Sequence, residues 1–541
     1  MLILLQLSYS YLIFSSLLGI CIIFFLHYYL SNNKSRSTPC PDSYPIIGNI
    51  ISFVENRHRF HDWVAEMLAA TPSLTLQVNG FLGLSHGICT ANPSNIEQML
   101  RSNFKNYVKG DRFQSVLDEL LGHGIFNVDG HLWSTQRKIA SHEFNTKSLK
   151  SFISTTVQTQ LCNKLIPYLC SVSERGHVID FQEILRRFTF DNICSVAFGV
   201  ENDVSFDDDC NDLSSFVGAF DFAVEVSSDR FMSPLPLIWK IKRRLNIGNE
   251  KRYKEAIKVI NEYAFNIIAT KEKCFHQQEK AEETKQDQDL LSRFIESTSS
   301  NLFEFQDQQE RRKFLRDIVI SFILAGKDST STALTWFFWL ISGHPRCEGL
   351  IYNELMAATK SENGNYLYNN QFSYNQLKNL HYLHAAITEA LRLFPPVPIN
   401  SRLVVSDDTL RDGTFVGKGW FADYSAYSMA RMQKLWGDDC CEFKPERWLD
   451  EDGVFQACDQ FKFPVFHSGP RMCLGKEMAY VQMKCVAAAV LYEFHVGVDG
   501  CGGDSRRVLL DHKQPPYTLS LLLKMKDGLP VRLLKRREIA N

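Results

Sequence analysis

Residues 466–475 read Phe466-His467-Ser468-Gly469-Pro470-Arg471-Met472-Cys473-Leu474-Gly475 and are followed directly by a helix-forming run that starts at Lys476. Backbone N–H groups and the positive end of a helix favour a thiolate over a thiol, and the thiolate is the form that binds a metal. Glycines let the backbone approach a large flat ligand because they carry no side chain. This segment, the cysteine loop, is therefore a candidate cofactor site, although a lone cysteine is more often a small buried apolar residue.

The composition of the 541-residue chain is that of a folded protein with 45% hydrophobic and 22% charged residues and a net charge of −2. It has no basic excess of the kind that nucleic-acid-binding proteins carry, so we expect no nucleic-acid partner. The 15 cysteines are odd in number and lack paired zinc-ligand spacing. This pattern favours reduced thiols in the cytosol over a disulfide framework.

The N-terminal segment contains no Lys, Arg, Asp or Glu between Met1 and Asn33. Its apolar run approaches the roughly 20 residues that span a bilayer. A cleaved signal peptide is the alternative, but the basic start and the small-residue cleavage site of such peptides are missing. Lys34 and Arg36 follow, so the positive-inside rule predicts a cytosolic remainder. We expect an anchor over residues 1–30, a basic and Pro-rich linker over 31–50 and a single domain over 51–541.

Two early strands are predicted by the alternation in residues 74–78 and 87–91. Asn92-Pro93 then predicts the start of a helix. Farther on, Trp133 and Arg137 are four residues apart and share a face of a predicted helix. An indole N–H and a guanidinium are both hydrogen-bond donors, so this pair could bind a carboxylate. A stacked surface pair is the plainer alternative.

A helix of about 30 residues is predicted over residues 312–342, where it ends before Gly343-His344-Pro345. It would be about 45 Å long, and its apolar residues lie on all sides, which predicts burial. The middle reads Ala325-Gly326-Lys327-Asp328-Ser329-Thr330, where the glycine and the hydroxyls weaken the helix. We expect room there for a small ligand and a polar path beside it. A kink satisfied by hydroxyl groups that bond back to the helix is the alternative.

Glu389 and Arg392 are three residues apart on a helix predicted over residues 382–394, so they can face each other. Their neighbours are apolar, which favours burial, and a buried ion pair needs further partners. Arg447 is a candidate for the third member. We expect a structural role for this group.

Together these motifs resemble the cytochrome P450 superfamily. The pattern Phe-x-x-Gly-x-Arg-x-Cys-x-Gly around Cys473 is similar to the haem-thiolate signature, in which the cysteine ligates the haem iron. Ala325-Gly326-Lys327-Asp328 is similar to the oxygen-binding groove of the family, with Ser329 where threonine is usual. The Glu-x-x-Arg pair and the later arginine resemble a triad that supports the haem-binding face. The motifs follow one another in the family's order over residues 1–475.

The resemblance implies a mainly α fold with smaller β-sheets (α+β), a long central helix over the haem and an N-terminal transmembrane helix. Residues 51–541 would form one haem-thiolate catalytic domain with haem b (iron protoporphyrin IX). The enzyme would use O2 and electrons that an NADPH–cytochrome P450 reductase passes on from NADPH. It would be a single-pass protein of the endoplasmic reticulum membrane with its catalytic domain in the cytosol.

The resemblance also assigns roles to particular residues. The haem would be held by Trp133, Arg137, Ala325, Gly326, Arg402, Phe466, Gly469, Arg471, Cys473 and Gly475. Cys473 would ligate the iron, and the arginines with Trp133 would neutralise the propionates. Protons would come from Asp328 together with Ser329 or Thr330, and the sequence does not choose between these two hydroxyls. The structural triad would be Glu389, Arg392 and Arg447.

The central helix and the cysteine loop are most similar to plant fatty-acid ω-hydroxylases. This similarity implies hydroxylation of a lipophilic carboxylic acid, most simply a long-chain fatty acid at or near its ω position. Two alternatives stay open: hydroxylation of a jasmonoyl–amino acid conjugate, and isomerisation or dehydration of a fatty-acid hydroperoxide without a reductase. Asp328 and its neighbouring hydroxyls argue against the second alternative, and against a haem carrier without catalysis.

Overall fold

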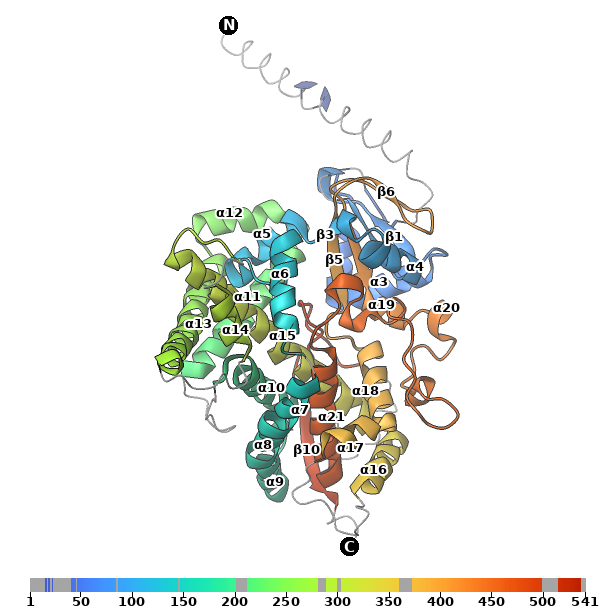
Figure 1. Ribbon diagram of the computed structural model, residues 1–541. Coiled ribbons are helices and arrows are strands. Elements are labelled where there is room, and N and C mark those ends of the chain that lie inside the picture. The colour runs from blue at the N-terminus through green and yellow to red at the C-terminus, as the bar shows by residue number, and fades with distance from the viewer. Residues whose placement is uncertain are drawn as a thin grey trace.

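The computed structural model of the chain describes residues 40–536 except 45, 84–85, 145, 201–211, 281–288, 299–302, 360–371 and 499–513, and also residues 15, 16, 18, 19 and 22. Helices make up most of this part, and the strands form three small sheets (Figure 1). The expected mainly α fold with smaller sheets is thus confirmed. The predicted anchor over residues 1–30 falls almost wholly outside the described residues. Within them, no helix has the length and apolar character to cross a bilayer.

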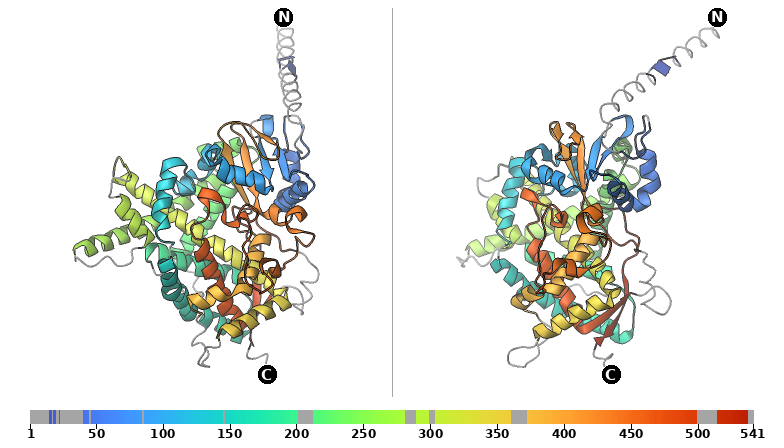
Figure 2. Two further views of the ribbon diagram at one scale, coloured as in Figure 1. Left: turned by 45° about the vertical axis from the view of Figure 1, so that its right-hand side comes forward. Right: turned by 90° about the vertical axis from the view of Figure 1, so that its right-hand side faces the viewer.

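The largest sheet has five strands in the order β1-β2-β8-β5-β3. Its first two strands, β1 (Thr75–Val78) and β2 (Gly87–Thr90), pair antiparallel as the alternation predicts. The Asn92 side chain accepts a hydrogen bond from Ser94 N, and Pro93 is the first residue of α4, so the predicted helix start is confirmed. The sheet lies at one end of the molecule in all three views (Figures 1 and 2).

The central helix α15 (Gln308–Ser342) has 35 residues and passes through the middle of the molecule (Figure 1). It begins four residues before the predicted start, because the Asp307 side chain caps it by accepting from Glu310 N. Two hydrophobic clusters share this helix. One packs α15 against α18 and α21, and the other packs it against α11, α13 and α14. Trp336 of the first cluster stacks on Phe394 with 4.0 Å between ring centroids.

The remaining elements surround this helix. The helices are α2 (Ile50–Asn56), α3 (Phe60–Ala69), α4 (Pro93–Glu97), α5 (Gly110–Leu121), α6 (Gly130–Ser141), α7 (Thr146–Ser151), α8 (Gln158–Gln160), α9 (Ile166–Arg175), α10 (Phe181–Phe198), α11 (Asp212–Phe231), α12 (Pro236–Leu245), α13 (Asn249–Lys280), α14 (Leu290–Thr298), α16 (Pro345–Thr359), α17 (Tyr374–Asn379), α18 (His381–Leu393), α19 (Ala426–Ala430), α20 (Gln433–Trp436) and α21 (Lys476–Glu493). The other strands are β3 (Tyr107–Val108), β4 (Ile179–Asp180), β5 (Ile399–Val404), β6 (Asp408–Thr409), β7 (Phe415–Val416), β8 (Phe421–Ser425), β9 (Phe494–Val498) and β10 (Pro530–Lys535).

Candidate active site around Cys473

The cysteine loop is held by its own backbone and by a neighbouring segment. Cys473 N donates to Phe466 O at 2.8 Å, and Gly475 is the N-cap residue of α21. Gly469 has a φ of +65°, and a Cβ at this position would collide with the carbonyl oxygen of Leu100. The sequence suggested that Gly469 makes room for a flat ligand. In the structure, it is the backbone of Leu100 that leaves no room for a side chain at position 469.

The Cys473 thiol is accessible and yet surrounded by protein. Its accessible surface classes it as exposed, yet burial raises the pKa of its thiol. A thiol at a concave internal surface has both properties, whereas one on the outer surface would have only the first. The backbone at Gly475 and the cations Arg137 and Lys476 lower this pKa. A metal cation at the sulfur would complete the stabilisation of the thiolate.

Two arginines connect this loop to neighbouring segments, Arg137 of α6 and Arg471 of the loop itself. Arg137 donates to Met472 O at 2.6 Å, and Arg471 donates to Val128 O at 2.8 Å and to Asp129 at 2.5 Å. Both guanidinium groups lie over the Trp133 ring, with Cζ–centroid distances of 4.5 Å for Arg471 and 5.9 Å for Arg137. The helix face that carries Trp133 and Arg137 thus meets the cysteine loop.

Arg402 lies deeper in the same region and is 1% exposed. Its Nη1 donates to Ser401 O at 2.9 Å, its Nη2 contacts His467 Nε2, and its Nε has no hydrogen-bond partner. Burial lowers the pKa of Arg402. Burial is the main reason that the pKa of His467 lies well below its usual range, and the positive charge of Arg402 lowers it further. Lys109 follows the same pattern, because burial, Arg402 and Arg471 hold its pKa well below the usual range.

These cations have too few anions around them. Among the described residues, Arg471 forms an ion pair with a carboxylate, that of Asp129, and no such pair is found for Lys109, Arg137 or Arg402. Buried charges without partners are costly. A group with two carboxylates would satisfy the free Arg402 Nε and relieve the mutual repulsion. Haem b has two propionates, so the donor set beside Cys473 fits haem on charge and on hydrogen-bonding capacity.

Helix α15 is continuous through residues 324–329, but its side chains are less buried there, where the sequence suggests it. Leu324, Ala325, Gly326 and Ser329 keep partial exposure on a helix whose neighbouring residues are buried. Ala325 and Ser329 are four residues apart and share a face. The Ser329 hydroxyl donates to Ala325 O at 2.6 Å, whereas Thr330 is buried. Of the two candidate hydroxyls, Ser329 is therefore the one that shares its face with Ala325.

Gly326 serves the packing of two helices. A Cβ at this position would lie 2.5 Å from Ile193 Cγ1 of α10. The space that the glycine creates is thus filled by a side chain, where the sequence suggested room for a ligand. The contact of Gly326 with haem stays a prediction.

Asp328 is fully buried and surrounded by cations. Lys327 Nζ lies 2.8 Å from its Oδ1, and Lys524 Nζ lies 3.2 Å from its Oδ2. Burial raises the pKa of this carboxyl, but Lys327, Lys524 and Arg186 outweigh burial and hold it well below its usual range. The acid is therefore ionised in this arrangement. Nothing in the sequence indicated Lys524, because it is almost 200 positions away in the chain.

Glu389 brings the predicted triad together. Its carboxylate is 2.8 Å from Arg392 Nε and 2.9 Å from Arg447 Nε, and it is fully buried. Trp448 Nε1 also donates to it at 2.8 Å. The arginines in turn donate to backbone carbonyls, among them Cys440 O for Arg392 and Asp439 O for Arg447. The group joins α18 to the segment that precedes the cysteine loop.

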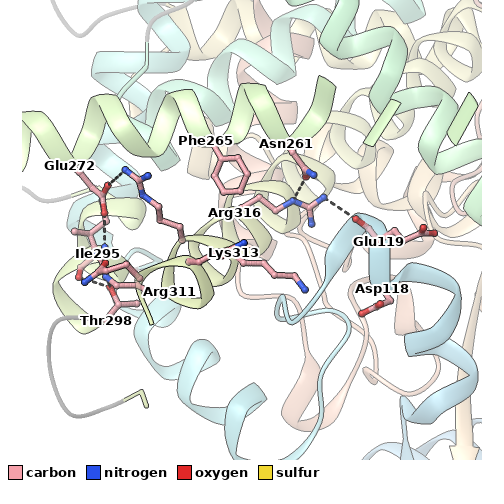
Figure 3. Close-up of a pocket in the computed structure, with 13 residues that line it drawn as sticks. Asp118, Glu119, Asn261, Phe265, Glu272, Ile295, Thr298, Arg311, Lys313 and Arg316 are labelled. Carbon is pink, nitrogen blue, oxygen red and sulfur yellow. Dashed lines mark hydrogen bonds and ion pairs between the residues drawn. The ribbon is translucent and has the colours of Figure 1, made fainter. Parts of the chain in front are cut away.

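A large cleft of about 1240 Å³ lies elsewhere, among α5, α13, α14 and the start of α15 (Figure 3). Polar side chains that bond to one another form much of its wall. Arg311 pairs with Glu272 at 2.6 Å, and Arg316 donates to Asn261 at 2.6 Å. None of the predicted site residues lines this cleft. Its size therefore does not make it the catalytic site.

An accessible thiol, a cluster of cations and a partly exposed stretch of an otherwise buried helix are the features expected of a haem-thiolate protein. A model of the family Cytochrome P450 matches residues 38–513. The chain is 44% identical over 501 residues to Cytochrome P450 94A1 of Vicia sativa (92% of this chain, 90% of that protein). It is 42% identical over 503 residues to Cytochrome P450 CYP94D108 of Paris polyphylla (92% and 94%) and 40% identical over 537 residues to Cytochrome P450 94B1 of Arabidopsis thaliana (97% of each). The chain belongs to the cytochrome P450 family and is a monooxygenase.

The family uses haem b and receives electrons from NADPH through a reductase. Four residues that shape the site were not singled out from the sequence: Lys109, Asp129, Lys524 and Asp221, whose Oδ1 lies 2.8 Å from Lys327 Nζ. Asp129 had a recognisable signal, because Asp-Gly precedes the helix of Trp133 and Asp is a preferred N-cap residue. Its carboxylate instead accepts from the backbone N–H groups of residues 109 and 110. The other three carried no local signal.

Proposed function

We propose that Cys473 ligates the haem iron and that Trp133, Arg137, Arg402 and Arg471 hold the propionates. Bound haem supplies the activation of O2 and the oxidation of a C–H bond. The chain contributes the thiolate, the cations and a proton donor, for which we propose Asp328 acting through Ser329. The observation that supports this assignment is the cluster of cations with too few anions next to Cys473, in a loop that has glycines on both sides of the cysteine.

The ligand assignment is tested by the absorption of the reduced protein with CO. We expect the thiolate-type band in the wild type and its loss in Cys473→Ala. Cys485→Ala is a matched control, because Cys485 is a buried cysteine of α21 in the same core. A histidine-type spectrum in the wild type, or an unchanged band in Cys473→Ala, would refute the assignment.

We propose a long-chain fatty acid as the substrate, hydroxylated at or near its ω position. Support comes from the resemblance of the central helix and the cysteine loop to fatty-acid ω-hydroxylases. Aliphatic residues with partial exposure also lie on three segments that meet: Leu324 on α15, Val397 just before β5 and Ile399 at its start, and Leu521 near the C-terminus. Hydrogen bonds from Trp336 Nε1 to Leu523 O and from Leu523 N to Pro396 O join these segments. Such a lining suits an apolar chain.

The substrate is tested with the holoenzyme, a reductase and NADPH against three substrate classes. Fatty acids of graded length should give ω or near-ω alcohols in an NADPH-dependent way. Turnover of a jasmonoyl–amino acid conjugate alone would favour the first alternative. Turnover of a fatty-acid hydroperoxide without NADPH, and of no fatty acid with it, would favour the isomerase.

We further propose that the protein sits on the endoplasmic reticulum membrane through residues 1–30. The uncharged N-terminal segment supports this, and so does α12, which lies at the same end of the molecule as the start of the described domain (Figure 1). Four aliphatic side chains of α12 are 49–67% exposed: Leu237, Ile238, Ile241 and Leu245. The same helix carries Lys240, Lys242, Arg243 and Arg244. An amphipathic helix of this kind suits an anionic membrane surface.

Removal of residues 1–33 should convert alkali-resistant membrane binding into binding that salt reverses. Ile238→Ser with Ile241→Ser should then release the truncated protein from vesicles that contain anionic lipid. Unchanged, alkali-resistant binding of the truncated protein would contradict the anchor.

A further inference from the structure

The adjacent cysteines Cys440 and Cys441 occupy the centre of a β-turn that follows α20. Glu442 N donates to Asp439 O at 3.0 Å and closes the turn. The two Sγ atoms are 3.8 Å apart. Cys440 is buried, and its thiol donates to Arg431 O at 3.4 Å, whereas Cys441 is exposed. One thiol of the pair is thus open to solvent, and the other lies in contact with it.

The backbone of this turn also holds the two arginines of the structural triad. Arg392 Nη1 donates to Cys440 O at 2.8 Å, and Arg392 Nη2 donates to Glu442 O at 3.2 Å. Arg447 Nη2 donates to Asp439 O at 3.0 Å and lies 3.1 Å from Asp439 Oδ1. The side chains of Arg392 and Arg447 are only 1% and 11% exposed, so both depend on protein groups for their hydrogen bonds. A change in the backbone at the two cysteines would therefore change how these arginines are held.

A disulfide between neighbours in the chain requires such a change. Adjacent Cα atoms are about 3.8 Å apart across a trans peptide, whereas disulfides usually join Cα atoms that are about 4.4–6.8 Å apart. The two sulfur atoms must also approach from 3.8 Å to a bond length of about 2.05 Å. A disulfide under strain is more easily reduced, so this bond suits a transient oxidation and not a permanent cross-link.

We propose that Cys440 and Cys441 are an oxidation site for hydrogen peroxide, where a reversible disulfide loosens the arginines of the triad. The oxidant forms whenever O2 takes up two electrons and two protons, so an enzyme that reduces O2 can meet it. The inference rests on the structural role of the triad. It depends neither on the proposed substrate nor on the assignment of Cys473 as the iron ligand.

Cys441 reacts first because it is the exposed thiol of the pair. Its sulfur bonds to one oxygen of hydrogen peroxide, the O–O bond breaks, and the other oxygen leaves as water, so that Cys441 becomes a sulfenic acid. The Cys440 sulfur then attacks the Cys441 sulfur. The S–S bond forms, the S–O bond breaks, and the hydroxyl leaves as water with the Cys440 proton. Two thiols and one hydrogen peroxide thus give one disulfide and two water molecules, and the sulfur atoms lose the two electrons that the peroxide gains.

This order of steps agrees with the surroundings of Cys440. Burial, and then the neighbouring Cys441, raises the pKa of the Cys440 thiol to about 11. Cys440 is therefore protonated near neutral pH and is a poor first nucleophile. Once Cys441 is a sulfenic acid, the short distance between the two sulfur atoms favours the second step over further oxidation.

The first test measures whether the bond forms. The full-length holoenzyme is treated with a small excess of hydrogen peroxide, freed of peroxide with catalase, blocked with maleimide and digested. The tryptic peptide over residues 435–447 contains Cys440 and Cys441 and no other cysteine. This peptide should be lighter by two hydrogen atoms and carry no maleimide, and dithiothreitol before blocking should restore both thiols. Two maleimides after peroxide treatment, or sulfinic acid without a disulfide, would overturn the proposal.

Two variants assign the bond to this pair. Cys441→Ser should abolish the loss of the two hydrogen atoms, and the exposed position should tolerate serine. Cys274→Ser is the matched control, because Cys274 of α13 is also exposed but has Lys273 and Phe275 as its neighbours in the chain. It should leave the oxidation of the pair unchanged. A bond that no longer forms in Cys274→Ser would contradict Cys441 as the thiol that reacts first.

The second test measures whether the bond loosens the triad. The ferric haem absorption is followed with temperature and without a reductant, so that the disulfide persists. The midpoint of its loss should be about 3–6 °C lower after oxidation, because the hydrogen bonds of the two charged guanidinium groups weaken. Dithiothreitol should restore the midpoint, which separates this effect from direct damage to the haem by peroxide. The shift should be absent in Cys441→Ser.

The outcomes are independent of the variants where that matters. If the bond forms but the midpoints before and after dithiothreitol agree within about 1 °C, the control of the triad is overturned. The comparison of oxidised with re-reduced wild type needs no variant, so it decides even if a variant does not fold.

Discussion

Replacement of Glu389 by glutamine tests whether this carboxylate is the structural centre of the proximal side. Five N–H groups point at it: Arg392 Nε and Nη2 at 2.8 Å, Trp448 Nε1 at 2.8 Å, Arg447 Nε at 2.9 Å and Lys444 N at 3.1 Å. Glutamine keeps the shape, removes the charge and turns an acceptor into a donor that faces guanidinium groups. Arg392, with a side chain only 1% exposed, would then be a buried cation without a counterion.

The cost follows from burial. Loss of one partner of a buried ion pair typically destabilises a protein by about 3–5 kcal/mol. Arg392 keeps its hydrogen bonds to Ala430 O and Cys440 O, which argues for the lower half of this range. At no more than about 2 °C per kcal/mol for a domain larger than 250 residues, Glu389→Gln should lower the midpoint of thermal inactivation by roughly 4–8 °C.

The assay is the loss of the thiolate-type CO signal with temperature at a fixed scan rate, because a protein with a bound cofactor does not unfold in two states. Glu446→Gln is the matched control in the same segment. Glu446 is 32% exposed and pairs with Arg346, which is 77% exposed, so its loss should cost about 0–1 kcal/mol. A Glu389→Gln midpoint within 2 °C of the control would refute the reasoning, where 2 °C is about the shift for 1 kcal/mol.

Three further perturbations follow from the site and the core. Arg402→Met should speed haem transfer to an excess of apomyoglobin by about 10–100-fold, because charged hydrogen bonds contribute about 1.5–3 kcal/mol; an unchanged transfer rate would remove Arg402 from the propionate site. Gly326→Ala should cost about 1–3 kcal/mol in urea unfolding, and Ile193→Ala should recover at least 1 kcal/mol of that, where strict additivity would contradict their contact. Burial lowers the pKa of Lys484 to about 8, so the unfolded state keeps this proton to higher pH, and stability should rise as the pH increases from about 8 toward 10.5. Lys484→Met should therefore be more stable than the wild type at pH 7 by about 1–2 kcal/mol, after allowance for the lost hydrogen bond to Leu377 O, and this advantage should shrink at pH 10; Lys484→Arg should show no such pH dependence.

Local sequence patterns predicted the early strands and several helix ends well, because strand alternation and helix capping depend on residues only a few positions apart. Alternation gave the pair β1 and β2, and the N-cap at Asn92 gave the start of α4. The end of α15 at Ser342 also agrees with the sequence. The start of α15 differs from the prediction, because the residues around Asp307 have a weak apolar periodicity. The Asp307 cap extends the helix there without that periodicity.

The sequence by itself determined the cysteine loop, the order of the motifs and thus the family, because these depend on residue types at fixed short spacings. Only the tertiary structure decided what surrounds Asp328 and why Gly326 and Gly469 are glycines. Lys524, Asp221, Ile193 and Leu100 come from distant parts of the chain, and electrostatic and steric contacts between them leave no periodic trace in the sequence. The acid of the central helix was visible as a residue, and so was its neighbour Lys327, but folding adds a second cation by bringing Lys524 to within 3.2 Å of the carboxylate.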